Sequence, residues 1–276
     1  MRHILQVPPD RDHYTRPVMD GIAHTRTSTI GSSIQDQYPL ISYNGAHSAL
    51  GVARSPELSA KLALLKYPAE KREIYKLAER ARERAGAMYA AEMGDVIHEA
   101  TFLADQGEEL EYMPDYVVND VAAYQATMAA HGLTPEVGEV FCGQPDILVA
   151  GSFDRVMRQD DELYVLDIKT SRQEEAFQWN ALSWATQVAI YANSTIWCKE
   201  RGYIPWETLG IQRPSRKVGL IAHIVQGSGV CTLYRVDLEE GWKAALVAMQ
   251  VHRLRAKAKT FITVQSEKTS LLPKQG

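Results

Sequence analysis

The apolar positions in the first half of the chain recur with the period of a helix. Between residues 55 and 104, Leu58 and Leu62 open a series of leucines and alanines that are separated mainly by charged residues. Apolar side chains three and four residues apart share one face of a helix, so several helices are predicted here. A further helix is expected over residues 118–132, where Gly132 provides a terminating residue.

Further along the chain, the apolar positions alternate with polar ones. This period of two is that of a strand, and residues 139–170 are predicted to form three consecutive strands. The pattern then predicts a helix over 174–202, strands over 217–226 and 230–238, and a last helix over 239–262. That order predicts an α/β (α+β) sandwich, in which helices flank a mixed central sheet.

Pro, Gly, Ser and Thr are concentrated at the start of the chain and interrupt both periods. We expect residues 1–45 to form an irregular N-terminal arm with little helix. Residues 46–276 are then expected to form one domain. It would consist of a helical part over 46–132, a sheet core over 133–240 and the C-terminal helix over 239–262.

The composition favours an intracellular protein without a general affinity for polyanions. The 276 residues are 45% hydrophobic, which is enough for a sizeable core, and the formal net charge is −4. This charge excludes a globally basic surface for nucleic acid. We see neither a secretion signal nor a membrane-spanning apolar run and expect a soluble cytoplasmic protein. Cys142, Cys198 and Cys231 are widely spaced, as reduced structural thiols often are.

Two acids and a lysine interrupt the strands predicted over residues 151–171. If these residues form a hairpin with its turn at 160–161, Asp154 directly opposes Asp167. Lys169 shares the face of Asp167, because side chains two residues apart point to the same side of a strand. The hairpin therefore predicts two carboxylates and one ammonium group in one place.

Directly opposed carboxylates, with Cβ atoms about 5 Å apart, repel each other unless a cation lies between them. Mg²⁺ is commonly held by one or two carboxylates together with phosphate oxygens and water. The alternative is that the acids and the lysine lie on a solvated face of the sheet. Val156 and Val165 share the face of the acids, and Leu166 and Ile168 share the other face. We therefore expect both faces to be buried, which favours a functional site.

Two other acids precede the hairpin. If the preceding strand turns back at residues 150–151, Asp146 points to the other face of the sheet and is rejected as a ligand. Glu139 could face the site, which leaves it a candidate for a second metal or for a supporting contact.

Four short motifs follow one another along the chain. They are Gly94 and His98 in GDVIH, Asp154 and Arg155 in GSFDRV, Asp167 and Lys169 in LDIKT, and Gln187 and Tyr191 in QVAIY. In this order they resemble the PD-(D/E)XK nuclease superfamily. Within it they resemble the RecB-like branch that includes CRISPR-adaptation and phage recombination exonucleases. The resemblance covers roughly residues 85–240 and implies a restriction-endonuclease-like fold.

The resemblance implies a metal-dependent deoxyribonuclease. The metal, Mg²⁺ or Mn²⁺, would be held by His98, Asp154, Asp167 and the backbone carbonyl of Ile168. Lys169 would orient or activate the water that attacks the phosphodiester. This set agrees with the preferences of the metals, since Mn²⁺ tolerates imidazole among oxygen ligands.

Gln187 and Tyr191 lie one helical turn apart and share a face. The resemblance implies that this face borders the active site or the DNA backbone. Ordinary packing is the alternative, particularly for Tyr191.

The substrate that the resemblance implies is linear DNA, degraded from an end in phage-type recombination, repair or other DNA processing. A recombination or single-strand-binding protein is a candidate partner. Assembly of the chain into a homo-oligomer is left open. CRISPR-adaptation exonucleases usually carry four cysteines for an iron–sulfur cluster, and the three cysteines here do not match, so no cluster is expected. The alternative function is that of a catalytically silent nuclease-fold module that binds DNA or protein.

Overall fold

The protein is described from a computed structural model, which covers residues 2–3, 9–13 and 15–263. Its helices are α1 Thr27–Ser32, α2 Tyr38–Ala53, α3 Pro56–Ala63, α4 Lys71–Arg84, α5 Tyr89–Gln106, α6 Asp115–Ala130, α7 Ala176–Asn193 and α8 Leu238–Lys257, with 3-10 turns η1 Trp206–Leu209 and η2 Ala258–Thr260. Its strands are β1 Arg2–His3, β2 Asp10–Arg11, β3 Pro17–Met19, β4 Ile22–Ala23, β5 Thr25–Arg26, β6 Thr134–Gln144, β7 Val149–Gln159, β8 Glu162–Ser171, β9 Thr195–Cys198, β10 Gly202–Ile204, β11 Val218–Val225 and β12 Val230–Asp237.

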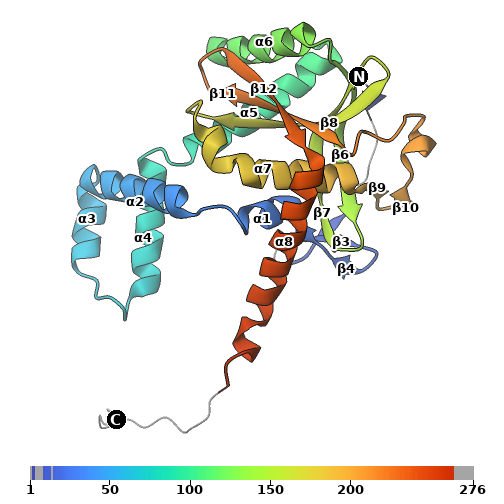
Figure 1. The fold of residues 1–276 in the computed structure, drawn as a ribbon. Coiled ribbons are helices and arrows are strands. Elements are labelled where there is room, and N and C mark those ends of the chain that lie inside the picture. The colour runs from blue at the N-terminus through green and yellow to red at the C-terminus, as the bar shows by residue number, and fades with distance from the viewer. Residues whose placement is uncertain (1, 4–8, 14, 264–276) are drawn as a thin grey trace.

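A mixed central sheet organises the molecule. Its strands follow the order β10-β9-β6-β7-β8-β11-β12, with β1 beside β6 and β5 beside β7. The chain passes from β6 to β7 to β8 through antiparallel pairings and then crosses over to β11, which runs parallel to β8. Helices cover both faces of the sheet (Figure 1). The expected sandwich of helices around a mixed sheet is therefore confirmed.

Two apolar layers form, one on each side of the sheet. On one side, Val156 and Val165 pack with residues of α7, among them Val188. On the other side, Leu166 and Ile168 pack with residues of α5 and α6. The central hairpin is thus buried on both faces, as the sequence predicted, which explains why its apolar positions are nearly continuous.

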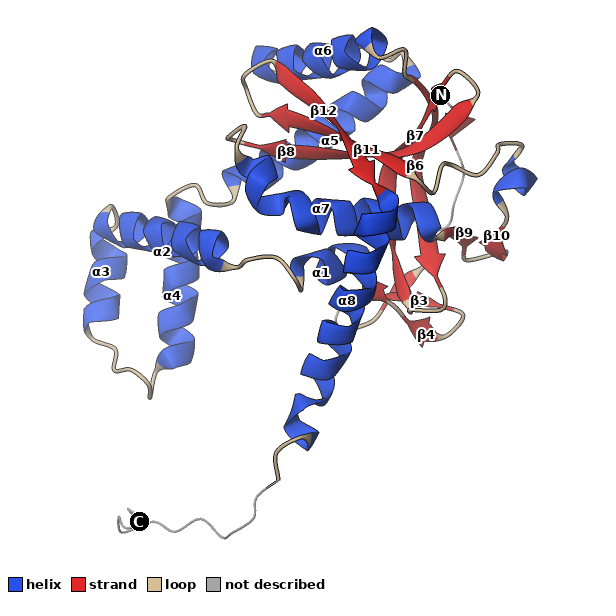
Figure 2. Cartoon of the chain, in the orientation of Figure 1, coloured by secondary structure: helices blue, strands red, loops and turns tan. Residues whose placement is uncertain are grey.

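A group of helices, α2, α3 and α4, projects beside the sheet (Figure 2). Leu58, Leu77 and Ala81 form a small apolar cluster of their own within it. The close approach of α2 to α4 depends on Gly51, because a Cβ atom there would lie 1.8 Å from the carbonyl oxygen of Ala81. We call α2, α3 and α4 the helical projection.

The N-terminal segment differs from the irregular arm expected over residues 1–45. It contains α1, the start of α2 and several short strands, two of which, β1 and β5, join the central sheet. Helix α2 begins at Tyr38 rather than at residue 46, because Pro39 suits the first turn of a helix. The division of the chain into an arm and a nuclease domain stays a prediction.

Two helix ends also differ from the sequence-based expectation. The helix expected over 174–202 ends at Asn193. The run Thr195–Cys198 becomes strand β9 between β10 and β6, because β-branched and aromatic residues favour strands. The last helix, expected to reach residue 262, ends as an α-helix at Lys257 and continues only as the short turn η2. Among the described helices, none combines the length and apolarity needed to cross a membrane.

Candidate active site

The hairpin of β7 and β8 has the register that the sequence predicted. Val156 pairs with Val165, and Arg155 pairs with Leu166. The regular pairing stops there, so the next position on each strand is occupied by Asp154 and Asp167. Their side chains are 20% and 6% exposed, respectively. Two carboxylates therefore lie together with little access to water.

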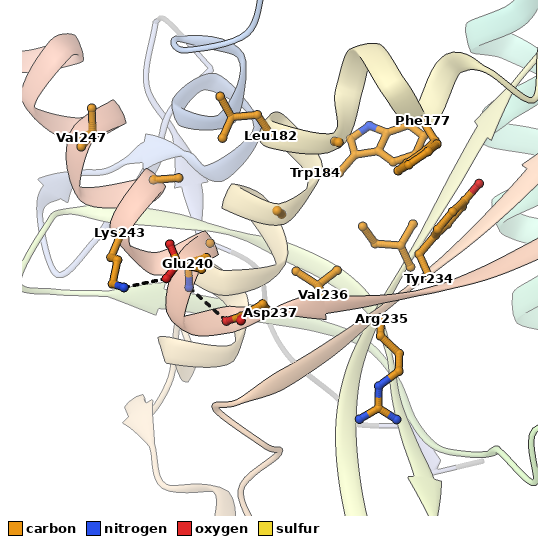
Figure 3. Close-up of a pocket in the computed structure, with 15 residues that line it drawn as sticks. Phe177, Leu182, Trp184, Tyr234, Arg235, Val236, Asp237, Glu240, Lys243 and Val247 are labelled. Atoms are coloured by element: carbon orange, nitrogen blue, oxygen red, sulfur yellow. Dashed lines mark hydrogen bonds and ion pairs between the residues drawn. The ribbon is translucent and has the colours of Figure 1, made fainter.

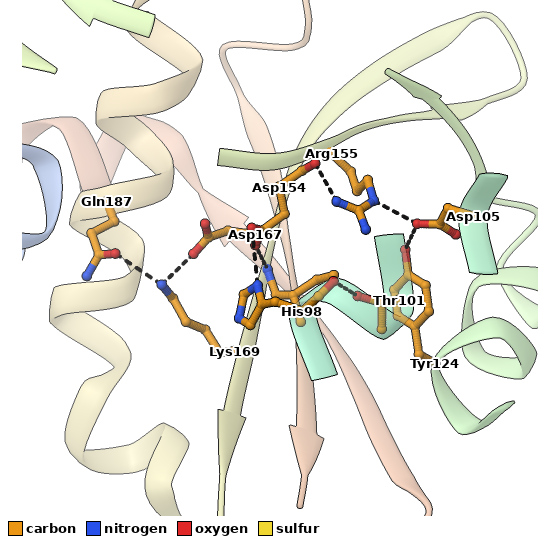
Figure 4. A network of polar contacts seen from close by, with 10 residues as sticks. His98, Thr101, Asp105, Tyr124, Asp154, Arg155, Asp167, Lys169 and Gln187 are labelled. Atoms are coloured by element: carbon orange, nitrogen blue, oxygen red, sulfur yellow. Dashed lines mark hydrogen bonds and ion pairs between the residues drawn. The ribbon is translucent and has the colours of Figure 1, made fainter. Parts of the chain in front are cut away.

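Short polar contacts join the acids to residues from two helices (Figure 4). Lys169 Nζ lies 2.6 Å from Asp167 Oδ2 and donates a hydrogen bond to Gln187 Oε1 on α7 at 3.1 Å. On the other side, His98 Nδ1 of α5 lies 3.3 Å from Asp154 Oδ1. The structure thus brings together five of the predicted site residues.

The backbone fixes one carboxylate. Asp154 Oδ2 accepts a hydrogen bond of 2.5 Å from the backbone N–H of Ile168. This bond ties the end of the regular β7–β8 pairing to the side chain of the first acid. The orientation of Asp154 therefore follows from the strand geometry.

Helix α5 reaches the hairpin because of a glycine. A Cβ atom on Gly94 would lie 2.8 Å from Thr170 Oγ1 of β8. Gly94 and His98 are four residues apart and share one face of α5. The small residue allows the helix to approach the strand, and the next turn carries the imidazole to Asp154. This is the physical reason for the spacing in GDVIH.

The two carboxyl groups have different environments. Burial raises the pKa of Asp167, and the neighbouring Asp154 charge raises it further, although Lys169 acts in the opposite direction. Burial also disfavours the charge on Asp154, but His98, the Ile168 N–H and Lys169 together lower its pKa. For His98, burial lowers the pKa, and the Asp154 carboxylate outweighs this effect and raises it. The two neighbouring carboxylates therefore repel each other in a poorly hydrated site, and a cation bound between them would relieve this repulsion.

The donor set fits a divalent metal. It offers two carboxylates and an imidazole, and Asp167 Oδ2 is buried without accepting a hydrogen bond of good geometry, although Lys169 pairs with it. Within the described residues, no group of three or more His, Cys, Asp or Glu side chains is already arranged around one point. His98 contacts Asp154 and Lys169 contacts Asp167, so the candidate ligands pair with their neighbours.

Tyr191 lies beside this group. It is buried, and its ring packs on Phe153 with centroids 5.7 Å apart. Burial and the charges of Asp167 and Asp154 raise its pKa well above the ordinary value. Tyr191 is thus near both acids but packs as a core residue.

The strand before the hairpin turns earlier than we expected. Gln144 pairs with Val149, so the chain reverses at residues 145–148 rather than at 150–151. Asp146 lies exposed in this turn, away from the hairpin acids. Glu139 is exposed at an irregular position with φ of 41°, between the pairs that flank Asp154 on the neighbouring strand. Its suggested supporting role stays a prediction.

Sequence reasoning missed a buried ion pair behind the site. Arg155, 1% exposed, donates from Nε to Asp105 Oδ2 at 2.7 Å and from Nη1 to the carbonyl of Asp154 at 2.7 Å. Tyr124 donates to the same Asp105 oxygen at 3.0 Å. Asp105 follows directly after residues 55–104, for which helices were predicted, and the structure places it in the last turn of α5. Asp105 follows His98 by seven residues, which is two helical turns, so both lie on one face of α5. This spacing was the sequence signal that could have placed Asp105 near the site.

A mostly apolar cavity of about 520 Å³ lies elsewhere, between α7, α8 and β12 (Figure 3). Phe177, Trp184 and Tyr234 contribute aromatic rings to its wall. Neither Gln187 nor either of the hairpin acids lines the cavity. We therefore assign it no part in the site.

The comparisons with known proteins give one family. The model of the PD-(D/E)XK nuclease superfamily matches residues 47–194, more than half of the chain. No curated protein matches the sequence. Among solved structures, SSO0001 is similar over 70% of this chain and 82% of its own, with 14% identity and a TM-score of 0.29. We draw nothing from this low similarity.

Proposed function

Because the chain belongs to the PD-(D/E)XK nuclease superfamily, we propose that it is a metal-dependent DNA exonuclease that hydrolyses phosphodiester bonds. The observation that supports this best is the convergence of Asp154, Asp167 and Lys169 from one hairpin with His98 and Gln187 from two helices. Members of this superfamily are generally nucleases that use divalent metals.

The metal would be Mg²⁺ or Mn²⁺, held by His98, Asp154, Asp167 and the carbonyl of Ile168. When bound, it supplies positive charge that neutralises the carboxylates and stabilises the negative charge that develops on the scissile phosphate. Asp154 contributes a carboxylate whose orientation is already set by the Ile168 N–H. Asp167 contributes an oxygen that is buried and poorly satisfied.

Lys169 is suited to act on water or phosphate. An ammonium group has three N–H donors, and here one faces Asp167 and another bonds to Gln187. Its third donor can orient the attacking water or contact a phosphate oxygen. Gln187 is a positioning residue in this scheme, because it also donates to Ser183 Oγ at 3.3 Å and thereby holds its amide across from Lys169.

The finer assignment follows the resemblance to the RecB-like branch. It includes digestion of linear DNA from an end, a role in phage-type recombination or repair, a cytoplasmic location and a recombination or single-strand-binding partner. We expect no iron–sulfur cluster. Cys142 and Cys198 pack in the apolar layer beside α7, whereas Cys231 packs against the layer on the other face of the sheet.

The test is digestion of end-labelled linear DNA and covalently closed circular DNA with Mg²⁺ or Mn²⁺. Wild-type protein should degrade the linear DNA alone. Lys169→Ala should reduce the rate by about 10²-fold or more, the usual cost of removing one group that stabilises the transition state. Lys217→Ala, which removes an exposed lysine outside the site, is the matched control and should keep the wild-type rate.

Other outcomes separate the alternatives. Cleavage of circular DNA would replace the exonuclease assignment by an endonuclease. Binding of DNA without cleavage in either metal would point to the catalytically silent module instead. Equal rates for wild type and Lys169→Ala would remove this site from the reaction.

A further inference from the structure

We propose that a pocket at the start of α5 binds an unpaired nucleotide of the DNA strand that occupies the active site. The pocket is about 510 Å³ in volume and is lined by Tyr89, Met93, Tyr116, Arg172, Gln226 and Gly227. This inference rests on the proposed function, because it assumes that DNA is the substrate.

The pocket lies close to the hairpin acids. Arg172 follows the end of β8, three residues after Lys169, which corresponds to about 10 Å along an extended chain. Tyr89 begins α5, nine residues before His98, which corresponds to about 14 Å along a helix. One strand and one helix therefore connect the pocket to the site, at a distance that a short stretch of nucleic acid can span.

Aromatic and cationic groups meet in this pocket. The guanidinium carbon of Arg172 lies 5.2 Å from the centroid of the Tyr89 ring. The neighbouring Tyr89 hydroxyl raises the pKa of Tyr116, which indicates that the two phenol groups lie close together. Both tyrosines are partly exposed, at 48% and 37%. Two aromatic rings thus remain accessible next to a positive charge.

The charge of the pocket favours an anion. Its lining contains no acidic side chain, and Arg172 makes no ion pair with any residue that the structure describes. The chain as a whole has a formal net charge of −4. The preference for an anion therefore comes from the local absence of acidic side chains around Arg172 and not from the overall charge. An exposed guanidinium stacked on tyrosine can contact a phosphate oxygen while the ring remains available to a base.

The wall of the pocket is held in place by buried polar groups. Asp120, which is fully buried, accepts hydrogen bonds from Gly227 N at 2.7 Å and Gly229 N at 2.8 Å. Gln226 Nε2 donates to the carbonyl of Ala90 at 2.7 Å and to Thr170 Oγ1 at 3.1 Å. Together these bonds join the β11–β12 turn to α6, α5 and β8. The pocket is therefore preorganised.

The same contacts orient the Gln226 amide. Because its nitrogen makes both bonds, its oxygen Oε1 is left as an acceptor, and it has no hydrogen-bond partner in the described part of the chain. This oxygen is buried, so the groups that the pocket offers to a ligand are the two rings and the guanidinium.

The combination favours a single strand over a duplex. A base stacked inside a duplex has both faces covered by its neighbours, whereas an unpaired base can place a face on a tyrosine. Stacking of this kind tolerates any base, and the arginine supplies the contact to the backbone. The pocket would hold the strand beside the scissile phosphate without reading its sequence.

The experiment measures binding without cleavage. Protein is titrated in Mg²⁺ into a fluorescently labelled oligothymidylate and, separately, into a blunt duplex of equal length. The oligothymidylate is longer than a typical single-strand site, which spans about 4–16 nucleotides. All proteins carry Lys169→Ala, which slows cleavage, and the labelled DNA is checked for intact length after each titration. The pocket variants are Tyr89→Ala, Tyr89→Phe and Arg172→Ala. Tyr112→Ala and Arg201→Ala remove exposed residues outside the pocket and are the matched controls.

Tyr89→Ala and Arg172→Ala should each raise the Kd for the oligothymidylate at least about fivefold, the lower end of the loss expected for one stacked base. Tyr89→Phe keeps the ring and should retain most of the affinity. The controls, and the binding of duplex to all variants, should change less than about twofold. If Tyr89→Ala proves unfolded in a thermal melt, the exposed Arg172 carries the test.

Unchanged affinity in both alanine variants would overturn the inference, as would equal losses for single strand and duplex. A protein that binds neither DNA would overturn it as well. The outcome is separate from that of the digestion test. If the wild-type protein hydrolyses DNA but the pocket variants bind with unchanged Kd values, only the pocket proposal is wrong. If the wild-type protein does not hydrolyse DNA but the pocket variants lose single-strand binding selectively, only the nuclease proposal is wrong.

Discussion

Asp154 and Arg155 are adjacent in the sequence but contribute to different parts of the molecule. Asp154 contacts His98 at the candidate active site. Arg155 points to the α5–α6 side, where it pairs with Asp105 and lies 5.0 Å from the ring centroid of Phe102. The dipeptide thus combines a candidate ligand with a buried support for the helix that carries the histidine.

Removal of the Arg155 charge should destabilise the protein strongly. Arg155→Met leaves Asp105 buried without its cation, and we expect a loss of about 3–5 kcal/mol in the free energy of unfolding by urea. Arg158→Met removes an arginine from a more exposed pair with Glu136, 3.0 Å away, and should cost less than about 1 kcal/mol.

The double variant Arg155→Met with Asp105→Leu separates charge from packing. It removes both partners of the pair, so it should be more stable than Arg155→Met alone. If the loss of stability in the double variant equals the sum of the losses in Arg155→Met and Asp105→Leu, the ion pair itself is not the cause of the destabilisation.

At the level of elements, close approaches of helices are set by glycines. Gly94 lets α5 approach β8, and Gly51 lets α2 approach α4. Gly45 lies on the same helix as Gly51 but has no neighbouring atom within 4 Å of a Cβ position. The two glycines of α2 therefore have different structural roles, although the sequence alone does not distinguish them.

Substitution of these two glycines should have opposite effects. Gly51→Ala should destabilise the helical projection by about 1–3 kcal/mol, because the added methyl overlaps the backbone of α4. Gly45→Ala should be neutral or stabilising by up to about 1 kcal/mol, since alanine favours a helix. Urea unfolding followed by circular dichroism measures both, and similar values for the two variants would contradict the packing argument.

At the scale of the whole molecule, the apolar core is divided unequally. The clusters beside the central sheet are extensive, whereas the helical projection has only the small cluster around Leu58, Leu77 and Ala81. Segments with few buried apolar contacts open locally at a lower free energy than the main core. The projection is therefore expected to be the less stable part.

Hydrogen exchange followed by mass spectrometry tests this expectation. Amides of residues 38–86 should exchange at least about tenfold faster than those of β7 and β8, because local opening needs less free energy there. Gly51→Ala should accelerate exchange further in the projection and leave β8 unchanged. Uniform protection of both regions would show that the projection and the sheet unfold as one unit.

Much of the fold and of the site could be predicted from local patterns. Alternation and a turn at residues 160–161 determine the register of the hairpin, since a shift by one residue would turn every apolar side chain to the wrong face. The pairing of Val156 with Val165 confirms that register. The order of motifs also placed His98 and Gln187 on helices, although only three-dimensional packing could bring those helices to the hairpin.

Local sequence patterns were enough to predict the central strands, most helices and the side chains that meet at the hairpin, because period and turn chemistry act over a few residues. Three features became visible only in the three-dimensional packing: α7 ends at Asn193, Asp105 pairs with Arg155, and Tyr89 and Arg172 share a pocket. Those features depend on contacts between residues far apart in the chain. Their free energy comes from burial and from partners that no local pattern contains.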